Sequence, residues 1–172
     1  MNRSGIGNRY RIEALKKAHS RKDFTCGSDA LDAYFHKQAS QDARRKVAAV
    51  FVAVEKDSNA VHGYYTLSMA EVLLDRLPKS LVKKMPRYPA LPAIRLGRLA
   101  VHQAVQGKRL GTFLLMDAIH RSVLNEVGWI AFMVDAKDDR VRDFYLQLGF
   151  HSFDNNPNQL YKMRQDIDLI FP

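Results

Sequence analysis

Apolar residues occur along this chain only in short runs, and this pattern limits the folds that it can form. The longest run, Val47–Val54 (VAAVFVAV), is much shorter than the roughly 20 apolar residues that a membrane-spanning helix needs. Residues 1–13 also lack the apolar segment of a signal peptide. The 172 residues suit one domain, since domains most often contain about 100–150 residues. We therefore expect one domain over residues 1–172, no association with a membrane, and a cytoplasmic location.

The spacing of the apolar residues predicts alternating strands and helices. Val47–Val54 and Val61–Leu74 are expected to pair as a hairpin. Further extended segments are expected at 10–15, 94–101, 129–134 and from 161 onward, with helices from Ser28 and at 77–84, 107–126 and 139–148. A loop is expected around Pro86, Pro89 and Pro92. This order predicts an α/β (mixed α+β) fold of three layers, in which helices flank a central mixed sheet.

The chain is strongly basic, with 27 Lys and Arg against 18 Asp and Glu, a formal net charge of +9. This balance favours a polyanionic partner such as nucleic acid, anionic lipid or a phosphorylated ligand. The basic residues gather at 1–22, 44–46 and 76–98. A basic face that is merely solvated would have the same composition. The candidate polyanion ligands in the third cluster are Arg76, Lys83, Lys84, Arg87, Arg95 and Arg98.

Metal and disulfide chemistry is not expected. Cys26 is the single cysteine, so it cannot form an intrachain disulfide or a cysteine metal cluster, and we interpret it as structural. The six histidines show neither HxxH nor HExxH spacing. We therefore predict that the protein has no metal site.

The stretch RLAVHQAVQGKRLGTFLL predicts a strand, a glycine-containing loop and then a helix. The first backbone N–H groups of a helix lack acceptors within it, and the helix dipole favours an anion beside them. Gly107 and Gly111 allow a ligand to approach the backbone, and Lys108 and Arg109 add positive charge. This chemistry suits a pyrophosphate. An ordinary strand-to-helix turn, in which the glycines serve only the chain geometry, would have a similar sequence. No P-loop or dinucleotide-binding motif is present.

The segment DDRVRDFYLQLGF predicts a helix with one apolar face. Val141, Phe144, Tyr145 and Leu148 recur at helical spacing. Tyr145 therefore turns an apolar ring inward, together with a hydroxyl that needs a partner. It is either a core tyrosine or a functional group.

These two stretches resemble the GNAT (GCN5-related) N-acetyltransferases. Gln106 and Gly111 match the first and last positions of the motif R/Q-x-x-G-x-G/A, whereas Arg109 replaces its central glycine. Backbone donation is compatible with this arginine if its φ is negative, and the alternative is that its side chain contacts phosphate or RNA instead. The spacing of Tyr145, Gly149 and Phe150 matches Y-x-x-x-G-F at every position.

The resemblance extends through FTCGSDALDAYF, GYYTLS and GRLAVH to the toxin subgroup of bacterial type II toxin–antitoxin modules. It implies an acetyltransferase that acts on the α-amino group of aminoacyl-tRNA, and Tyr145 as the general acid for the leaving thiolate. It further implies a ribbon–helix–helix antitoxin, a homodimer, and the six basic residues above as tRNA ligands. Tyr88 would either stack on a base or pack in its loop. The implied acetyl-CoA ligands are Leu99, Ala100, Val101, Gln106, Gly107, Lys108, Arg109, Leu110, Gly111 and Thr112.

Two other functions stay open on the sequence. One is acetylation of a protein N-terminus, a polyamine or an antibiotic, although such cationic acceptors usually need acidic residues in the site. The other is a non-catalytic GNAT module in a DNA-bound regulatory complex, against which Tyr145 and the glycine loop argue. Glu71 is either a base that holds a water or an exposed strand glutamate.

Overall fold

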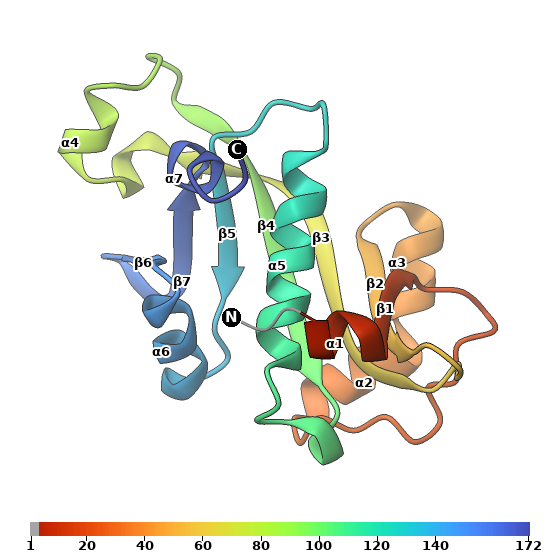
Figure 1. The fold of residues 1–172 in the computed structure, drawn as a ribbon. Coiled ribbons are helices and arrows are strands. Elements are labelled where there is room, and N and C mark those ends of the chain that lie inside the picture. The colour runs from red at the N-terminus through yellow and green to blue at the C-terminus, as the bar shows by residue number, and fades with distance from the viewer. Residues whose placement is uncertain (1–3) are drawn as a thin grey trace. The chain divides into compact units, whose positions relative to one another are not determined.

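The computed structural model describes residues 4–172, which form seven strands and several helices (Figure 1). The strands lie in one sheet in the order β1-β2-β3-β4-β5-β7-β6. They are β1 (Tyr10–Ala14), β2 (Ala49–Glu55), β3 (Val61–Leu73), β4 (Ala90–Val101), β5 (Ala131–Asp135), β6 (His151–Phe153) and β7 (Asn156–Met163). The helices are α1 (Ser4–Arg9), α2 (Asp29–Lys37), α3 (Ala39–Arg45), η1 (Leu74–Arg76), α4 (Lys79–Val82), η2 (Gln103–Val105), α5 (Leu110–Val123), α6 (Asp139–Gln147) and α7 (Arg164–Asp168).

Contacts along the chain divide it into two compact units. The first unit runs to Ser68 and includes Gly97–Ile119, and the second consists of Met69–Leu96 and His120–Pro172. Strands β3 and β4 and helix α5 contribute residues to both units. None of the helices described at 4–172 is long and apolar enough to span a membrane.

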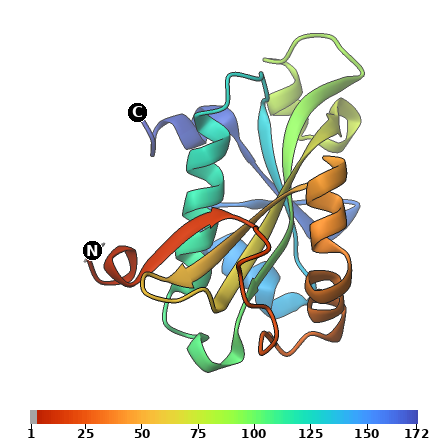
Figure 2. The same cartoon turned by 90° about the vertical axis from the view of Figure 1, so that its right-hand side faces the viewer.

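The first unit is built on an antiparallel sheet. Tyr10 of β1 pairs with Glu55 of β2, and Ala49 of β2 pairs with Leu67 of β3, which confirms the predicted hairpin. Figure 2 shows α2 and α3 on one side of these strands and α5 on the other. The predicted arrangement of helices on both faces of a sheet is therefore present.

Consecutive residues of β3 explain how both faces are covered, because side chains alternate along a strand. The Tyr64 ring stacks on Phe35 of α2 at 4.2 Å, and its hydroxyl donates to the Leu31 carbonyl at 2.8 Å. The neighbouring Tyr65 hydroxyl donates to Asp117 of α5 at 2.6 Å. Tyr64 thus anchors one helical layer and Tyr65 the other.

The second unit pairs β4 in parallel with β5 through Ala93–Leu96, and β5 and β6 are each antiparallel to β7. Met133, Phe153 and Tyr161 belong to an apolar cluster that includes residues of η1 and α4. On alternate positions, Phe132 contacts Phe150, which in turn contacts Tyr145 of α6. Helices therefore cover both faces of this unit as well.

Some predicted boundaries were wrong. Pro92 lies inside β4 rather than in a loop, where its carbonyl accepts the Ile130 N–H at 2.9 Å. The predicted helix 107–126 begins only at Leu110, because Gly107 and Arg109 have positive φ angles that a right-handed helix excludes. Helix α1 was not predicted, since its short sequence SGIGNR has no apolar periodicity.

Replacing Gly63 with alanine tests how closely β3 and α5 approach. A Cβ at this position would lie 2.7 Å from Leu114 Cδ1 and 3.1 Å from the Ala100 carbonyl oxygen. We expect Gly63→Ala to lower the free energy of unfolding by about 1–3 kcal/mol in denaturant titration, the usual cost of overpacking. Gly128→Ala is the control, since a Cβ there meets no atom within 4 Å. Equal effects of the two substitutions would contradict this packing.

Candidate functional site

The loop between β4 and α5 presents a row of backbone donors. Gly107 and Arg109 have φ angles of +75° and +66°, and the first helical bond runs from the Phe113 N–H to the Arg109 carbonyl at 3.1 Å. Within residues 4–172, the N–H groups of 107–112 find no acceptor. Together with the N-terminal end of the 14-residue helix α5, these donors favour an anion.

This loop is braced from behind by the segment that follows β1. The Gln106 side-chain amide donates to the carbonyls of Val101 and Cys26, both at 2.9 Å. The Gln103 N–H donates to the Thr25 carbonyl, also at 2.9 Å. Both amide contacts are thus within the protein, so the structure gives Gln106 a supporting role, while direct contact with a ligand stays a prediction.

Asp32 in turn fixes the bracing segment, and sequence reasoning did not select it. Its carboxylate accepts the Thr25 hydroxyl at 2.8 Å and the Cys26 N–H at 2.9 Å. Burial alone would raise the pKa of Asp32, but these hydrogen bonds outweigh burial and lower it. The sequence FTCGSDALD could have indicated this role. Asp32 lies one helical turn beyond Ser28, so its carboxylate can reach back to the residues that precede α2. Cys26 is buried, in line with a structural role.

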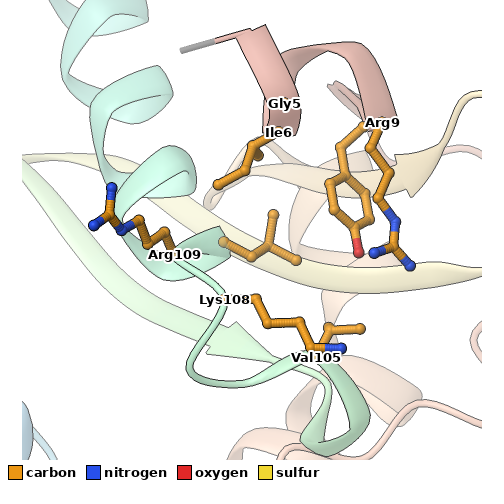
Figure 3. A pocket seen from close by; sticks show the side chains of 8 residues that line it. Gly5, Ile6, Arg9, Val105, Lys108 and Arg109 are labelled. Carbon is orange, nitrogen blue, oxygen red and sulfur yellow. The ribbon is translucent and has the colours of Figure 1, made fainter. Parts of the chain in front are cut away.

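A pocket of about 350 Å³ lies beside the loop (Figure 3). Its volume falls at the lower end of the range for small-molecule sites. Figure 3 shows it between α1 and the loop that enters α5. Sequence reasoning selected Lys108, Arg109 and Leu110 but missed the α1 side of the pocket. The lining residues are Gly5, Ile6, Arg9, Tyr10, Val105, Lys108, Arg109 and Leu110.

Tyr145 lies in the second unit on α6, where only 1% of the residue is exposed. Its ring packs edge-on against Phe144 and Phe150 at 5.1 and 5.5 Å. Its hydroxyl makes no hydrogen bond with the described residues, and none of their fully buried side-chain polar atoms lacks a partner. The small exposed part of Tyr145 therefore includes the hydroxyl.

The environment of Tyr145 keeps this hydroxyl neutral. Burial raises the pKa of the phenol well above its usual value of 10, and the nearby charge of Asp135 raises it further. Tyr145 is therefore a protonated donor throughout the physiological pH range.

Comparison with known proteins decides the family. The acetyltransferase (GNAT) domain matches residues 82–160. A tRNA-acetylating toxin of Mycobacterium tuberculosis is 33% identical over 145 residues, which cover 83% of this chain and 85% of that protein. The chain belongs to the GNAT acetyltransferase family. It is accordingly an N-acetyltransferase.

Solved structures of other GNAT toxins have the same fold. A tyrosine-to-phenylalanine mutant of KacT superposes with a TM-score of 0.88 at 27% identity, covering 95% of this chain and 99% of the other. AtaT in complex with acetyl-methionyl-tRNAfMet superposes with a TM-score of 0.87 at 29% identity, with the same coverage. The mixed α/β prediction is confirmed by these likenesses.

Three of the candidate basic residues of this GNAT protein are engaged within their own units. In the second unit, Arg76 donates to Gln159 at 2.7 Å and lies over the Phe153 ring, and Arg95 pairs with Asp135 at 2.6 Å. In the first unit, the Arg98 guanidinium lies 3.5 Å above the centre of the Tyr34 ring. Each of these arginines therefore already has a partner within the protein.

The other three candidates, Lys83, Lys84 and Arg87, are exposed on the segment after α4. No ion pair or side-chain hydrogen bond joins them to any residue of 4–172. Tyr88 is 62% exposed beside them, which favours the prediction of a free aromatic face over a packed one. Glu71 is exposed on β3.

Arg109 departs from the GNAT pattern, and its φ is positive rather than negative, although its N–H still has no acceptor among residues 4–172. The observed φ of +66° is a conformation in which a side chain costs roughly 1–2 kcal/mol and glycine costs little. The glycine of the family motif therefore suits this loop better, and the arginine holds a strained conformation beside the pocket.

This strain can be measured. We expect Arg109→Gly to be more stable than Arg109→Ala by about 1 kcal/mol, because both lose the charge but only glycine relieves the backbone. Lys108, whose φ is not positive, is the control, since there glycine is expected to be less stable than alanine. Chemical denaturation of the four variants gives both differences. The same order at both positions would contradict strain at Arg109.

Proposed function

We propose that this protein is a toxin that transfers an acetyl group from acetyl-CoA to the α-amino group of aminoacyl-tRNA and so blocks translation. The observation that carries the proposal is the 33% identity, over 83% of the chain, with a protein named as a tRNA-acetylating toxin. The likeness to AtaT in complex with acetyl-methionyl-tRNAfMet supports the same acceptor.

The first unit fits a coenzyme A diphosphate. Its residues offer N–H groups at 107–112 without acceptors, the positive end of α5, and the cations of Lys108 and Arg109. When bound, acetyl-CoA supplies the acetyl group as an activated thioester. Related AtaT structures contain it. In this proposal the backbone of Leu99, Ala100 and Val101 holds the pantetheine arm, and one strand N–H polarises the thioester carbonyl.

An α-amine acceptor suits a site without a dedicated base. The α-amino group has a pKa of about 7.7–8.0, and an ester neighbour lowers it, so much of it is neutral at cellular pH. A lysine side chain, with a pKa near 10.4, would need a strong base. Glu71, the only carboxylate that the sequence put forward as a base, is an exposed strand residue.

Tyr145 is proposed as the acid that serves the leaving thiolate. Because burial raises its pKa, the phenol stays protonated and always has a proton to donate. The raised pKa also makes it a weaker acid than a free phenol. Its contribution would therefore be a strong hydrogen bond to the developing thiolate. The proton that the acceptor's amino group loses on forming the amide balances the one that the released thiol carries, so Tyr145 ends the reaction protonated.

Tyr145→Phe separates this chemical role from packing. The substitution keeps the ring that contacts Phe144 and Phe150 and removes a hydroxyl without a partner among the described residues. We expect the transfer rate constant to fall about 10²–10⁴-fold, the usual contribution of general acid catalysis. The melting temperature and acetyl-CoA affinity should stay nearly unchanged. A collapse of acetyl-CoA binding would instead identify Tyr145 as a packing residue.

Binding of tRNA is proposed to depend on Lys83, Lys84 and Arg87. These cations have no ion-pair partner among residues 4–172, so a phosphate does not have to displace an internal contact. Arg76, Arg95 and Arg98 are already engaged and are expected to contribute less. Exposed Tyr88 offers a ring on which an unpaired base can stack.

Neutralising Lys83, Lys84 and Arg87 together to glutamine should weaken tRNA binding tenfold or more at low salt. The slope of log affinity against log salt should fall by about 2–3, since each phosphate contact contributes close to one. Filter binding across a salt series measures both values. The control removes as many charges from other exposed positions, as Lys37→Gln, Lys56→Gln and Lys137→Gln. An equal effect of the control would show that only net charge matters.

The acceptor itself is tested by supplying labelled acetyl-CoA with charged total tRNA, deacylated tRNA, or a polyamine. We expect label to enter only the charged tRNA pool, because the deacylated pool has no α-amine. Label in the polyamine, with none in tRNA, would contradict the proposal.

The proposed partners are inferred from those seen in structures of the same toxins. AtaT has been solved with the C-terminus of its antitoxin AtaR, and KacTA with DNA. We propose that this chain also pairs with an antitoxin, that this antitoxin is a ribbon–helix–helix protein, and that the toxin forms a homodimer and acts in the bacterial cytoplasm. Size-exclusion chromatography with light scattering tests the dimer.

A further inference from the structure

The pocket beside the loop between β4 and α5 has a second wall, which comes from another segment of the chain. Ile6, Arg9 and Tyr10 line it from α1 and the start of β1, and Val105 and Leu110 line it from the other side. Tyr10, Val105 and Leu110 are buried. The pocket therefore has apolar walls, which suit a flat, weakly polar ring better than they suit a phosphate.

The charged residues that line this pocket all have the same sign. Arg9, Lys108 and Arg109 are cations, and no carboxylate lines the pocket. Figure 3 shows the Lys108 side chain extending toward the side where Arg9 lies, whereas Arg109 extends to the other side, along α5. An anion in this pocket would meet positive charge from two separate segments of the chain.

Arg9 is held in place while it keeps donors to spare. Its Nε and Nη2 donate to Glu55 Oε1 at 2.9 and 2.7 Å, and its guanidinium lies 5.2 Å from the Tyr10 ring centre. Half of its side chain is exposed. Since a guanidinium has five N–H donors, Glu55 orients Arg9 without using all of them.

We propose that this pocket binds the adenosine 3′-phosphate end of coenzyme A, with Arg9 and Lys108 recognising the 3′-phosphate. Coenzyme A carries an adenine ring and a phosphate dianion beyond its diphosphate, and these match the apolar walls and two of the cations that line the pocket, Arg9 and Lys108. The inference rests on the proposed function, in which acetyl-CoA is the source of the acetyl group. It gives α1, a helix that was not predicted from the sequence, a role in selecting the 3′-phosphorylated coenzyme.

Calorimetric titration with acetyl-CoA and with 3′-dephospho-acetyl-CoA tests this subsite. We expect the wild type to bind acetyl-CoA about tenfold more tightly than the dephospho form. Arg9→Gln should reduce this preference to about twofold and leave affinity for the dephospho form unchanged. Lys108→Gln should also reduce the preference, but it should weaken binding of both coenzymes, because Lys108 lies beside the proposed diphosphate site as well. Glu55→Gln should preserve or increase the preference, because it frees Arg9 from its partner. Lys56→Gln, which removes an exposed charge next to Glu55, should leave the preference at its wild-type value.

Three outcomes would overturn the inference. One is a wild-type protein that binds both coenzymes equally. Another is an equal loss of affinity for both coenzymes in Arg9→Gln, which would make Arg9 a folding residue. The third is a Lys108→Gln variant that keeps the full preference, a result that does not depend on whether Arg9→Gln folds. Continued transfer to aminoacyl-tRNA in these cases would leave the proposed function standing, whereas no binding of either coenzyme would contradict that function itself.

Discussion

The close approach of α5 to β3 at Gly63 is the contact on which the first unit depends. Only a residue without a side chain lets Leu114 descend onto the strand, since a Cβ would lie 2.7 Å from its Cδ1. The next two residues, Tyr64 and Tyr65, attach α2 and α5 to opposite faces. This contact fixes the first turns of α5, and with them the loop that offers N–H donors to an anion.

The loop shows how a strained backbone can be supported. Arg109 holds a conformation that favours glycine, and Gln106 ties the loop to the end of β4 and to Cys26. Asp32 then holds the segment that contains Cys26. The stretch FTCGSDALD thus supports the loop that presents the N–H donors. Such a scaffold is needed because the N–H groups of 107–112 have no acceptor among residues 4–172 that would hold the loop in place.

Sequence patterns predicted the β2–β3 hairpin, the sheet with helices on both faces, and the loop before α5, because all of these follow from local spacing. They did not predict α1 or its part in the pocket, since SGIGNR has no periodicity and reaches the loop only through tertiary structure. They also treated the basic residues as equivalent. The structure separates Arg76, Arg95 and Arg98, which are held by Gln159, Asp135 and Tyr34, from the exposed cations after α4. Such pairings join residues far apart in sequence, so spacing could not reveal them.

The central claim is that the acetyl group is attached to the α-amine of the amino acid on tRNA, and the position of that group tests it most directly. Charged tRNA treated with the protein and acetyl-CoA can be digested with ribonuclease, and the released 3′-terminal aminoacyl-adenosine analysed by mass spectrometry with fragmentation. The account predicts an added acetyl group on the α-nitrogen of the amino acid. Acetyl groups on nucleobases, or an unmodified aminoacyl-adenosine together with acetylated protein or polyamine, would contradict it.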